Sequence, residues 1–408
     1  MAKLSEIKQA LNLTVIVAAL GYFVDMFDIT LFGVVRTTSL KDLGLTDPQQ
    51  LLDSGILIYN MQMIGMMIGG VIWGMMADRK GRLSVMFGSI LLYSLGNIAN
   101  AFVWDVNSYA ICRLITGIGL AGELGAAITL VAETLPKNIR GIGTTIVATL
   151  GLMGSVSAAY FGQMLHWKTA YIVGGLMGLA LLVTRFRMFE SGMFEKSFKA
   201  GVVRGSLGML FERKRLGKYI LCILMGVPIY FITGILFTFA PELTKGLNLT
   251  GPVTAANCLL YGSIGLAIGD MLTGLLSQTL RSRKKAVLIS LAIAFVGMMI
   301  YLQSFGASPN LIYILCFVMG GAAGYWAVLV TIAAEQFGTN MRGTVATTVP
   351  NFIRGSAVVS ATTFAYLKNH MSLTQAALVV GLSCFALATL AVLLLEETFD
   401  KNLDYVEE

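Results

Sequence analysis

Charged side chains are scarce in this sequence. Asp, Glu, Lys and Arg make up 12% of the 408 residues, whereas hydrophobic residues make up 56% and the mean hydropathy is +0.77. Soluble proteins carry about 25% charged residues. The shortage of charge therefore excludes an ordinary water-soluble protein and indicates that lipid surrounds most of the chain.

Cysteine and histidine are also few. The chain has five cysteines and two histidines, without the paired spacing of a metal-binding motif. The cysteines fall in apolar stretches, where a thiol behaves as a small core residue. No nucleophile with an adjacent base is visible either. We therefore expect no enzyme activity, no metal and no cofactor, and we expect these residues to be structural thiols: Cys112, Cys222, Cys258, Cys316 and Cys384.

Long apolar runs are what the sequence does contain. Twelve of them are about 20 residues long, and a helix of that length crosses roughly 30 Å of hydrocarbon. They predict an all-α membrane protein. We place the spans at residues 12–37, 55–77, 84–103, 107–132, 142–162, 168–188, 217–240, 254–277, 285–304, 309–334, 344–366 and 373–395.

The basic residues between the spans predict the orientation of the chain. If the N-terminus is cytoplasmic, 22 of the 29 Lys and Arg residues fall on the cytoplasmic face and 5 on the opposite face. Both termini are therefore expected inside. The net charge of +7 then reflects loops beside anionic lipid heads rather than a nucleic-acid partner. The first apolar run has full spanning length, so we expect it to remain as a helix rather than to be a cleaved signal.

The sequence contains an internal repeat. AETLPKNIRG at residues 132–141 is matched by AEQFGTNMRG at residues 334–343, and the glutamates of the two copies are 202 residues apart. Glycine pairs recur at the same offset: Gly119 and Gly122, and Gly321 and Gly324. A duplicated six-helix unit explains these matches.

The longest hydrophilic stretch divides the twelve spans six and six. We expect an N-terminal six-helix bundle at residues 1–188, a cytoplasmic linker at 189–216 and a C-terminal six-helix bundle with a short cytoplasmic tail at 217–408. The loops are compact, which favours a bacterial inner membrane. Asn248 lies in a glycosylation motif that would be used only in a eukaryotic source.

Two motifs carry a resemblance to a known family. GMMADRKGR at residues 74–82 resembles the signature loop of the major facilitator superfamily, and RLITGIGLAGE at 113–123 is similar to that superfamily's helix 4 motif. DMFDITLFG at 25–33 is similar to the helix 1 pattern of metabolite:proton symporters and to the acidic pair of phosphate and aromatic-acid proton symporters. The resemblance implies two pseudo-symmetric six-helix bundles, with a central cavity lined by helices 1, 4, 7 and 10.

Three acidic residues inside the spans are candidates for proton coupling. A charge at bilayer depth costs at least about 2.5 kcal/mol, so it persists where it faces a cavity or a partner. Asp25 and Asp28 share one face of helix 1, and Glu123 lies near the middle of helix 4. We expect Asp25, Asp28 and Glu123 to load and release protons. The alternative is that they anchor neighbouring helices through hydrogen bonds.

A buried arginine is the main candidate for substrate binding. Arg354 lies near the middle of helix 11, where a guanidinium needs a carboxylate partner or an anionic substrate. A permanent pair with Asp270 of helix 8 is the structural alternative. Arg113 reads as an anchor of helix 4 or as a side chain that reaches the interface. Further cavity candidates, for which ordinary packing is the alternative, are Tyr325, Trp326, Asn60 and Gln62.

Charged residues at the cytoplasmic ends of the helices are candidates for a gate. The resemblance implies an inner latch between the halves, made in one state and broken in the other. The second copy of the signature loop has Gln278 where the first has Asp78, so only the N-terminal copy is expected to be complete. The latch candidates are Asp78, Arg79, Arg82, Glu133 and Arg140.

The expected function is secondary active transport by alternating access. We expect proton-coupled symport of a small organic anion or zwitterion by a monomer embedded in membrane lipid. A proton-coupled exporter remains open, although helix 5 lacks the proline-rich motif of drug antiporters. A carrier of organic cations also remains open, because the intramembrane charges add up to an acidic excess. A membrane sensor without transport is the remote alternative.

Overall fold

The computed structural model describes residues 12–80, 82–136, 140–185, 212–338 and 341–399. The regular elements within these ranges are helices. In the N-terminal half they are α2 (Leu13–Asp42), α3 (Pro48–Lys80), α4 (Arg82–Asn100), α5 (Val106–Leu120), α6 (Glu123–Thr134), α7 (Arg140–Met164) and α8 (Trp167–Arg185). In the C-terminal half they are α11 (Arg213–Phe231), η1 (Ile232–Phe237), α12 (Ala240–Lys245), α13 (Ala255–Thr279), α14 (Arg283–Leu302), α15 (Pro309–Ala323), α16 (Trp326–Glu335), α17 (Arg342–Leu367) and α18 (Leu373–Leu394).

Each of the twelve predicted spans overlaps a described helix or a broken pair of helices. Nine helical segments in the described ranges are long and apolar enough to cross a membrane. The other three spans correspond to α4, to the α5 and α6 pair, and to α17, which carries more polar residues. Long apolar helices satisfy their backbone groups internally, as lipid requires.

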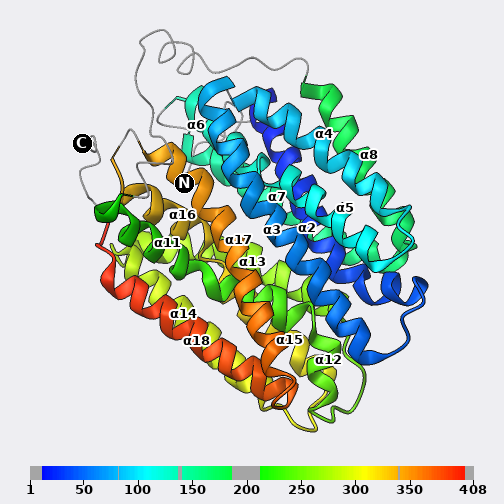
Figure 1. The fold of residues 1–408 in the computed structure, drawn as a ribbon. Coiled ribbons are helices and arrows are strands. Elements are labelled where there is room, and N and C mark those ends of the chain that lie inside the picture. The colour runs from blue at the N-terminus through cyan, green and yellow to red at the C-terminus, as the bar shows by residue number, and fades with distance from the viewer. Residues whose placement is uncertain (1–11, 81, 137–139, 186–211, 339–340, 400–408) are drawn as a thin grey trace.

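The helices form two six-helix bundles, as predicted. Figure 1 shows α2 to α8 gathered on one side of the molecule and α11 to α18 on the other. Within the first bundle α2 packs against α7 and α8, and within the second α13 packs against α15. The halves meet where α3 packs on α17 and where α7 packs on α13. Any cavity enclosed between them is therefore walled by helices from both halves.

Two helices that we expected to be continuous are broken at equivalent positions. The predicted span 107–132 divides between α5 and α6 at Ala121 and Gly122, and the span 309–334 divides between α15 and α16 at Gly324 and Tyr325. At the second break a Cβ on Gly324 would collide with backbone atoms of α13. The glycines of the repeat thus allow close helix packing, and the chain gives up helical hydrogen bonds there.

A third irregularity lies in the first span of the second half. Pro228 lies inside α11, and the six-residue π-helix η1 follows at Ile232–Phe237. Proline removes a backbone donor, and short π-helical segments occur frequently at functional sites. Thr233 and Phe237 of this segment lie on the cavity described next.

We call the end of the bundle near Arg36 and Lys368 the outer end and the opposite end the inner end. The names follow the orientation predicted from the basic loops.

Candidate functional site

A cavity of about 80 Å³ lies between the two halves. That volume has room for several water molecules. Of the residues that line it, Arg354 is the one that carries a charge. The lining residues are Tyr22, Met26, Ile29, Thr30, Leu152, Ser155, Ile229, Tyr230, Thr233, Phe237, Leu259, Gly262, Ser263, Leu266, Trp326 and Arg354.

Arg354 is held in place by residues of its own half. Its Nε donates to the hydroxyl of Tyr230 at 3.0 Å, and its Nη1 donates to Oδ1 of Asn351, one turn earlier on α17, at 3.2 Å. Its guanidinium carbon lies 6.0 Å from the ring centre of Trp326, whose ring meets that of Tyr230 edge to face. The side chain is 1% exposed. It is thus a fixed positive charge framed by two aromatic rings.

Asp25 faces this arginine from the other half. Its Oδ2 lies 3.9 Å from Nη2 of Arg354, and both side chains are buried. Neither carboxylate oxygen has a hydrogen-bond partner among the described residues. The separation is close enough for strong attraction at low dielectric but too long for a hydrogen bond. Asp25 is therefore held by charge across the interface rather than by a network within its own bundle.

Asp28 has a different environment although it lies one turn away. Its Oδ1 accepts from Nη2 of Arg113 at 3.2 Å, and the same nitrogen donates to Oδ1 of Asn97 at 2.6 Å. The guanidinium carbon of Arg113 lies 4.8 Å from the ring centre of Tyr171. The described side chains of this cluster all come from the N-terminal bundle. Arg113 is therefore an anchor inside its bundle, and its side chain does not extend to the membrane–water interface.

Glu123 is also paired within the N-terminal bundle. It forms an ion pair with Arg185 of α8, and both side chains are fully buried. Nη1 of Arg185 also donates to the carbonyl of Met86 at 2.8 Å. A Cβ on Gly21 would collide with both members of the pair. Arg185, the last residue of α8, is thus buried in the bundle interior.

Asp270 lies at the break between α15 and α16. Its Oδ1 accepts the backbone N–H of Ala327 in the first turn of α16 at 2.8 Å. A helix start leaves such donors without partners, and a carboxylate placed there offsets the positive end of the helix dipole. The carboxylate that faces Arg354 is thus Asp25, and Asp270 serves the broken helix.

The remaining substrate candidates have different surroundings. Trp326 lines the cavity, whereas Tyr325 is buried and donates to the carbonyl of Met225 at 3.0 Å. Asn60 donates to Oγ1 of Thr362 across the interface at 3.2 Å. Gln62 is buried, and its amide has no hydrogen-bond partner among the described residues.

The residues of the predicted inner latch lie at helix ends near the inner end of the first bundle. Asp78 and Arg79 fall in the last turn of α3, Arg82 begins α4, Glu133 lies near the end of α6 and Arg140 begins α7. Their side chains are outside the described part of the structure. The latch therefore stays a prediction.

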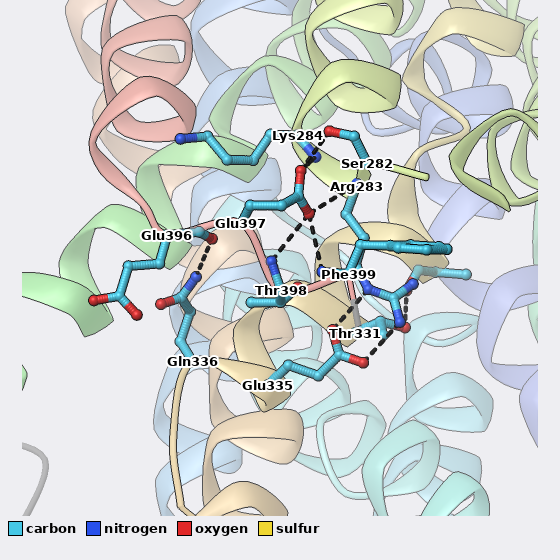
Figure 2. A network of polar contacts seen from close by, with 11 residues as sticks. Ser282, Arg283, Lys284, Thr331, Glu335, Gln336, Glu396, Glu397, Thr398 and Phe399 are labelled. Carbon is cyan, nitrogen blue, oxygen red and sulfur yellow. Dashed lines mark hydrogen bonds and ion pairs between the residues drawn. The ribbon is translucent and has the colours of Figure 1, made fainter. Parts of the chain in front are cut away.

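The inner end of the second bundle holds a polar network that we did not predict (Figure 2). Nε and Nη2 of Arg283 donate to the two oxygens of Glu335, both at 2.7 Å. Glu397, beyond the end of α18, accepts from the hydroxyl of Ser282 and from the backbone N–H of Arg283 at 3.0 Å and Lys284 at 3.2 Å. The pKa of Glu397 is raised by burial, but these hydrogen bonds outweigh that effect and hold it below its ordinary value.

The outer end joins the halves through two ion pairs that we also missed. Nη2 of Arg36 donates to both carboxylate oxygens of Glu242, at 2.7 and 2.9 Å. Lys368 at the end of α17 pairs with Asp53 of α3. In the sequence these residues read as ordinary loop charges. The feature that could have predicted the two ion pairs is that their opposite charges lie at helix ends of opposite halves.

Comparison with known proteins places these features in a family. Residues 18–362 match the Major Facilitator Superfamily. The chain is 28% identical over 296 residues to the 3-(3-hydroxy-phenyl)propionate transporter of Escherichia coli, covering 70% of this chain and 71% of the relative. It is 26% identical over 288 residues to a sialic acid transporter of the same species, covering 68% of each.

A solved structure of a D-xylose-proton symporter has the same fold. Its TM-score is 0.73 at 18% identity, covering 95% of this chain and 99% of the other. The protein belongs to the major facilitator superfamily. It is a multi-pass membrane transporter and not an enzyme.

Proposed function

We propose that the protein imports a small carboxylate-bearing metabolite together with a proton, by alternating access of its two bundles. The substrate class we favour is the aromatic carboxylic acid. The observation that carries this proposal is the isolated pair of Asp25 and Arg354, one from each half. A single guanidinium faces both the cavity and a carboxylate that has no hydrogen-bond partner among the described residues.

The pair suggests how anion and proton would be coupled. An anionic substrate needs Arg354, and so does ionised Asp25. Protonation of Asp25 removes its negative charge and leaves the guanidinium free to bind the substrate. Loss of the proton returns Asp25 to Arg354 and expels the anion. Proton and substrate therefore favour the same state, which is the thermodynamic requirement for coupling.

The cavity lining supports an anion over a cation. Apart from Arg354 its residues are neutral, and several are aromatic. Asp28 and Glu123 already have arginine partners inside the N-terminal bundle. The acidic excess counted from the sequence is thereby largely compensated, and it no longer argues for a cationic substrate. A carboxylate on Arg354 with its ring packed against Trp326 and Tyr230 fits this chemistry.

The similar proteins also support a carboxylate substrate and coupling to protons. The two relatives are transporters of 3-(3-hydroxy-phenyl)propionate and of sialic acid, which both bear a carboxylate group, and the structural neighbour is a D-xylose-proton symporter. We propose that the protein resides in a bacterial inner membrane as a monomer, with both termini in the cytoplasm.

Uptake into proteoliposomes tests the proposal. An acidic exterior should raise accumulation of labelled 3-phenylpropionate in wild-type vesicles, and Arg354→Gln should abolish the accumulation. The exposed Lys245→Gln is the matched control and should transport normally. Accumulation that ignores the pH gradient would refute symport, and unaffected anion uptake by Arg354→Gln would refute the binding role. Outward movement driven by the gradient would instead identify an exporter.

A further inference from the structure

The cavity contains a hydroxyl pair that the proposed transport reaction does not use. Oγ1 of Thr30 on α2 donates to Oγ of Ser155 on α7 at 2.9 Å. Oγ of Ser155 donates in turn to the carbonyl of Met26 at 3.3 Å. Both residues line the cavity. The pair therefore forms a short chain of hydrogen bonds with one direction.

The direction of this chain decides what it can bind. A hydroxyl group has one hydrogen to donate and two lone pairs. The hydrogen of Ser155 is taken by a backbone carbonyl, which can only accept. The hydrogen of Thr30 is then taken by Ser155. The oxygen of Thr30 consequently offers lone pairs, and no hydrogen, to a molecule in the cavity.

The position of the pair complements that of Arg354. Tyr22, Met26 and Thr30 recur at helical spacing and line the cavity from one face of α2. Arg354 lies beside Asp25, which is five residues before Thr30 on α2. At 1.5 Å per residue, Thr30 lies roughly 7.5 Å farther along the helix axis than Asp25 and the level of Arg354. One aromatic ring with a short acid side chain spans such a distance.

We infer that Thr30 and Ser155 form a specificity site for a hydrogen-bond donor at the far end of the substrate. The ligand class is a hydroxylated aromatic carboxylic acid, with its carboxylate on Arg354 and its phenolic O–H donating to Thr30. A substituent of similar size that only accepts, such as a methoxy group, meets lone pairs and is rejected. This inference rests on the proposed function, because it assumes that Arg354 holds a carboxylate.

Binding of three related acids tests the inference. The purified protein is titrated with 3-phenylpropionate, with 3-(3-hydroxyphenyl)propionate and with 3-(3-methoxyphenyl)propionate. Wild type should bind the hydroxylated acid about 3- to 10-fold more tightly than the unsubstituted acid, the value of one hydrogen bond, and should bind the methoxy acid most weakly. Thr30→Val should remove the preference for the hydroxyl while retaining affinity for the unsubstituted acid, which also reports that the variant is folded.

The Ser155→Ala variant tests whether specificity depends on the orientation of the Thr30 hydroxyl and not only on the presence of a polar group. Without Ser155 the hydrogen of Thr30 is free to turn toward the cavity, so the methoxy acid should gain affinity while the hydroxylated acid still binds. Ser157→Ala on the same helix is the matched control, because its hydroxyl donates to the carbonyl of Met153 at 2.8 Å and it is outside the described lining.

The outcomes distinguish the inference from the proposed function. If wild type binds the three acids equally, or if Thr30→Val keeps the wild-type ranking, the inference is wrong although transport of aromatic acids stands. If wild type binds none of the three acids, both the substrate class and the inference are wrong.

Discussion

Arg36 of α2 and Glu242 of α12 form an ion pair that joins the two halves at their outer end. The arginine is fully buried and the glutamate is 13% exposed. The same guanidinium nitrogen donates to the carbonyl of Thr238 at 3.2 Å, and the guanidinium carbon lies 4.5 Å from the ring centre of Phe239. One cation thus closes contacts with three groups of the opposite half, next to the π-helix.

Breaking this pair should open the outer end. In Glu242→Gln the buried guanidinium loses its counter-charge, which costs about 3 kcal/mol. Such a cost shifts the ratio of outer-closed to outer-open protein by roughly 100-fold. Spin labels at the exposed positions Asp47 and Lys245 should then report longer distances between the halves. Glu212→Gln, which removes the exposed carboxylate paired with Arg215 inside one half, is the matched control.

An unchanged distance distribution in Glu242→Gln would mean that the pair is not what holds the outer end closed. The Lys368 and Asp53 pair, with Asp53 52% exposed, should contribute less, because an exposed partner is screened by water.

Glu123 should prove to be a stabilising residue of the N-terminal bundle. Glu123→Gln leaves Arg185 buried without a counter-charge, and we expect a loss of about 3 to 5 kcal/mol in the free energy of unfolding. The double variant Glu123→Leu with Arg185→Leu should recover most of that loss, because it removes both charges. Thermal unfolding of the purified protein measures both effects. Equal destabilisation by the double variant would contradict this account.

Asp270 should act as a cap of α16 rather than as a charge. Asp270→Asn keeps an oxygen for the N–H of Ala327, so it should melt and transport like wild type. Asp270→Ala leaves that donor without its partner and should lose about 1 kcal/mol of stability. A comparison of melting temperature with counterflow in the two variants decides the point. Loss of counterflow in Asp270→Asn would identify substrate contact or a role for the charge.

Docking of the segment after α18 should weaken in acid. The pKa of Glu397 lies below its ordinary value of 4.5, so the hydrogen bonds to its ionised form stabilise the docked segment above that pH. They are lost as the pH falls through the lowered pKa. Limited proteolysis of the C-terminal segment should therefore accelerate below about pH 4.5. Glu397→Gln should be cleaved quickly at pH 7 and should show little further acceleration in acid.

Much of the fold could be predicted from the sequence because hydrocarbon imposes a simple constraint on each segment. A span needs about 20 apolar residues and must satisfy its own backbone, and both conditions are local. The breaks in the fourth and tenth spans were missed for the opposite reason. Gly122 and Gly324 favour a break only when a neighbouring helix approaches, and that neighbour is distant in the sequence.

The candidate site was predictable in its residue types but not in its pairings. Intramembrane acids and arginines stand out by their cost in lipid, so Asp25 and Arg354 were identified. Their partnership was not, because it joins residues 329 positions apart in different halves. Tyr230, Asn351 and Thr30 were overlooked for another reason. A single hydroxyl or amide in an apolar helix gives no periodic or charge signal of its own.

The central claim is that Asp25 and the anionic substrate compete for Arg354. The most direct test is the affinity for 3-phenylpropionate, measured by calorimetry as a function of pH in wild type and in Asp25→Asn. Wild-type affinity should fall as the pH rises, because ionised Asp25 then occupies Arg354. Asp25→Asn should bind tightly with little dependence on pH. A variant that follows the wild-type curve, or that binds more weakly at every pH, would contradict the account.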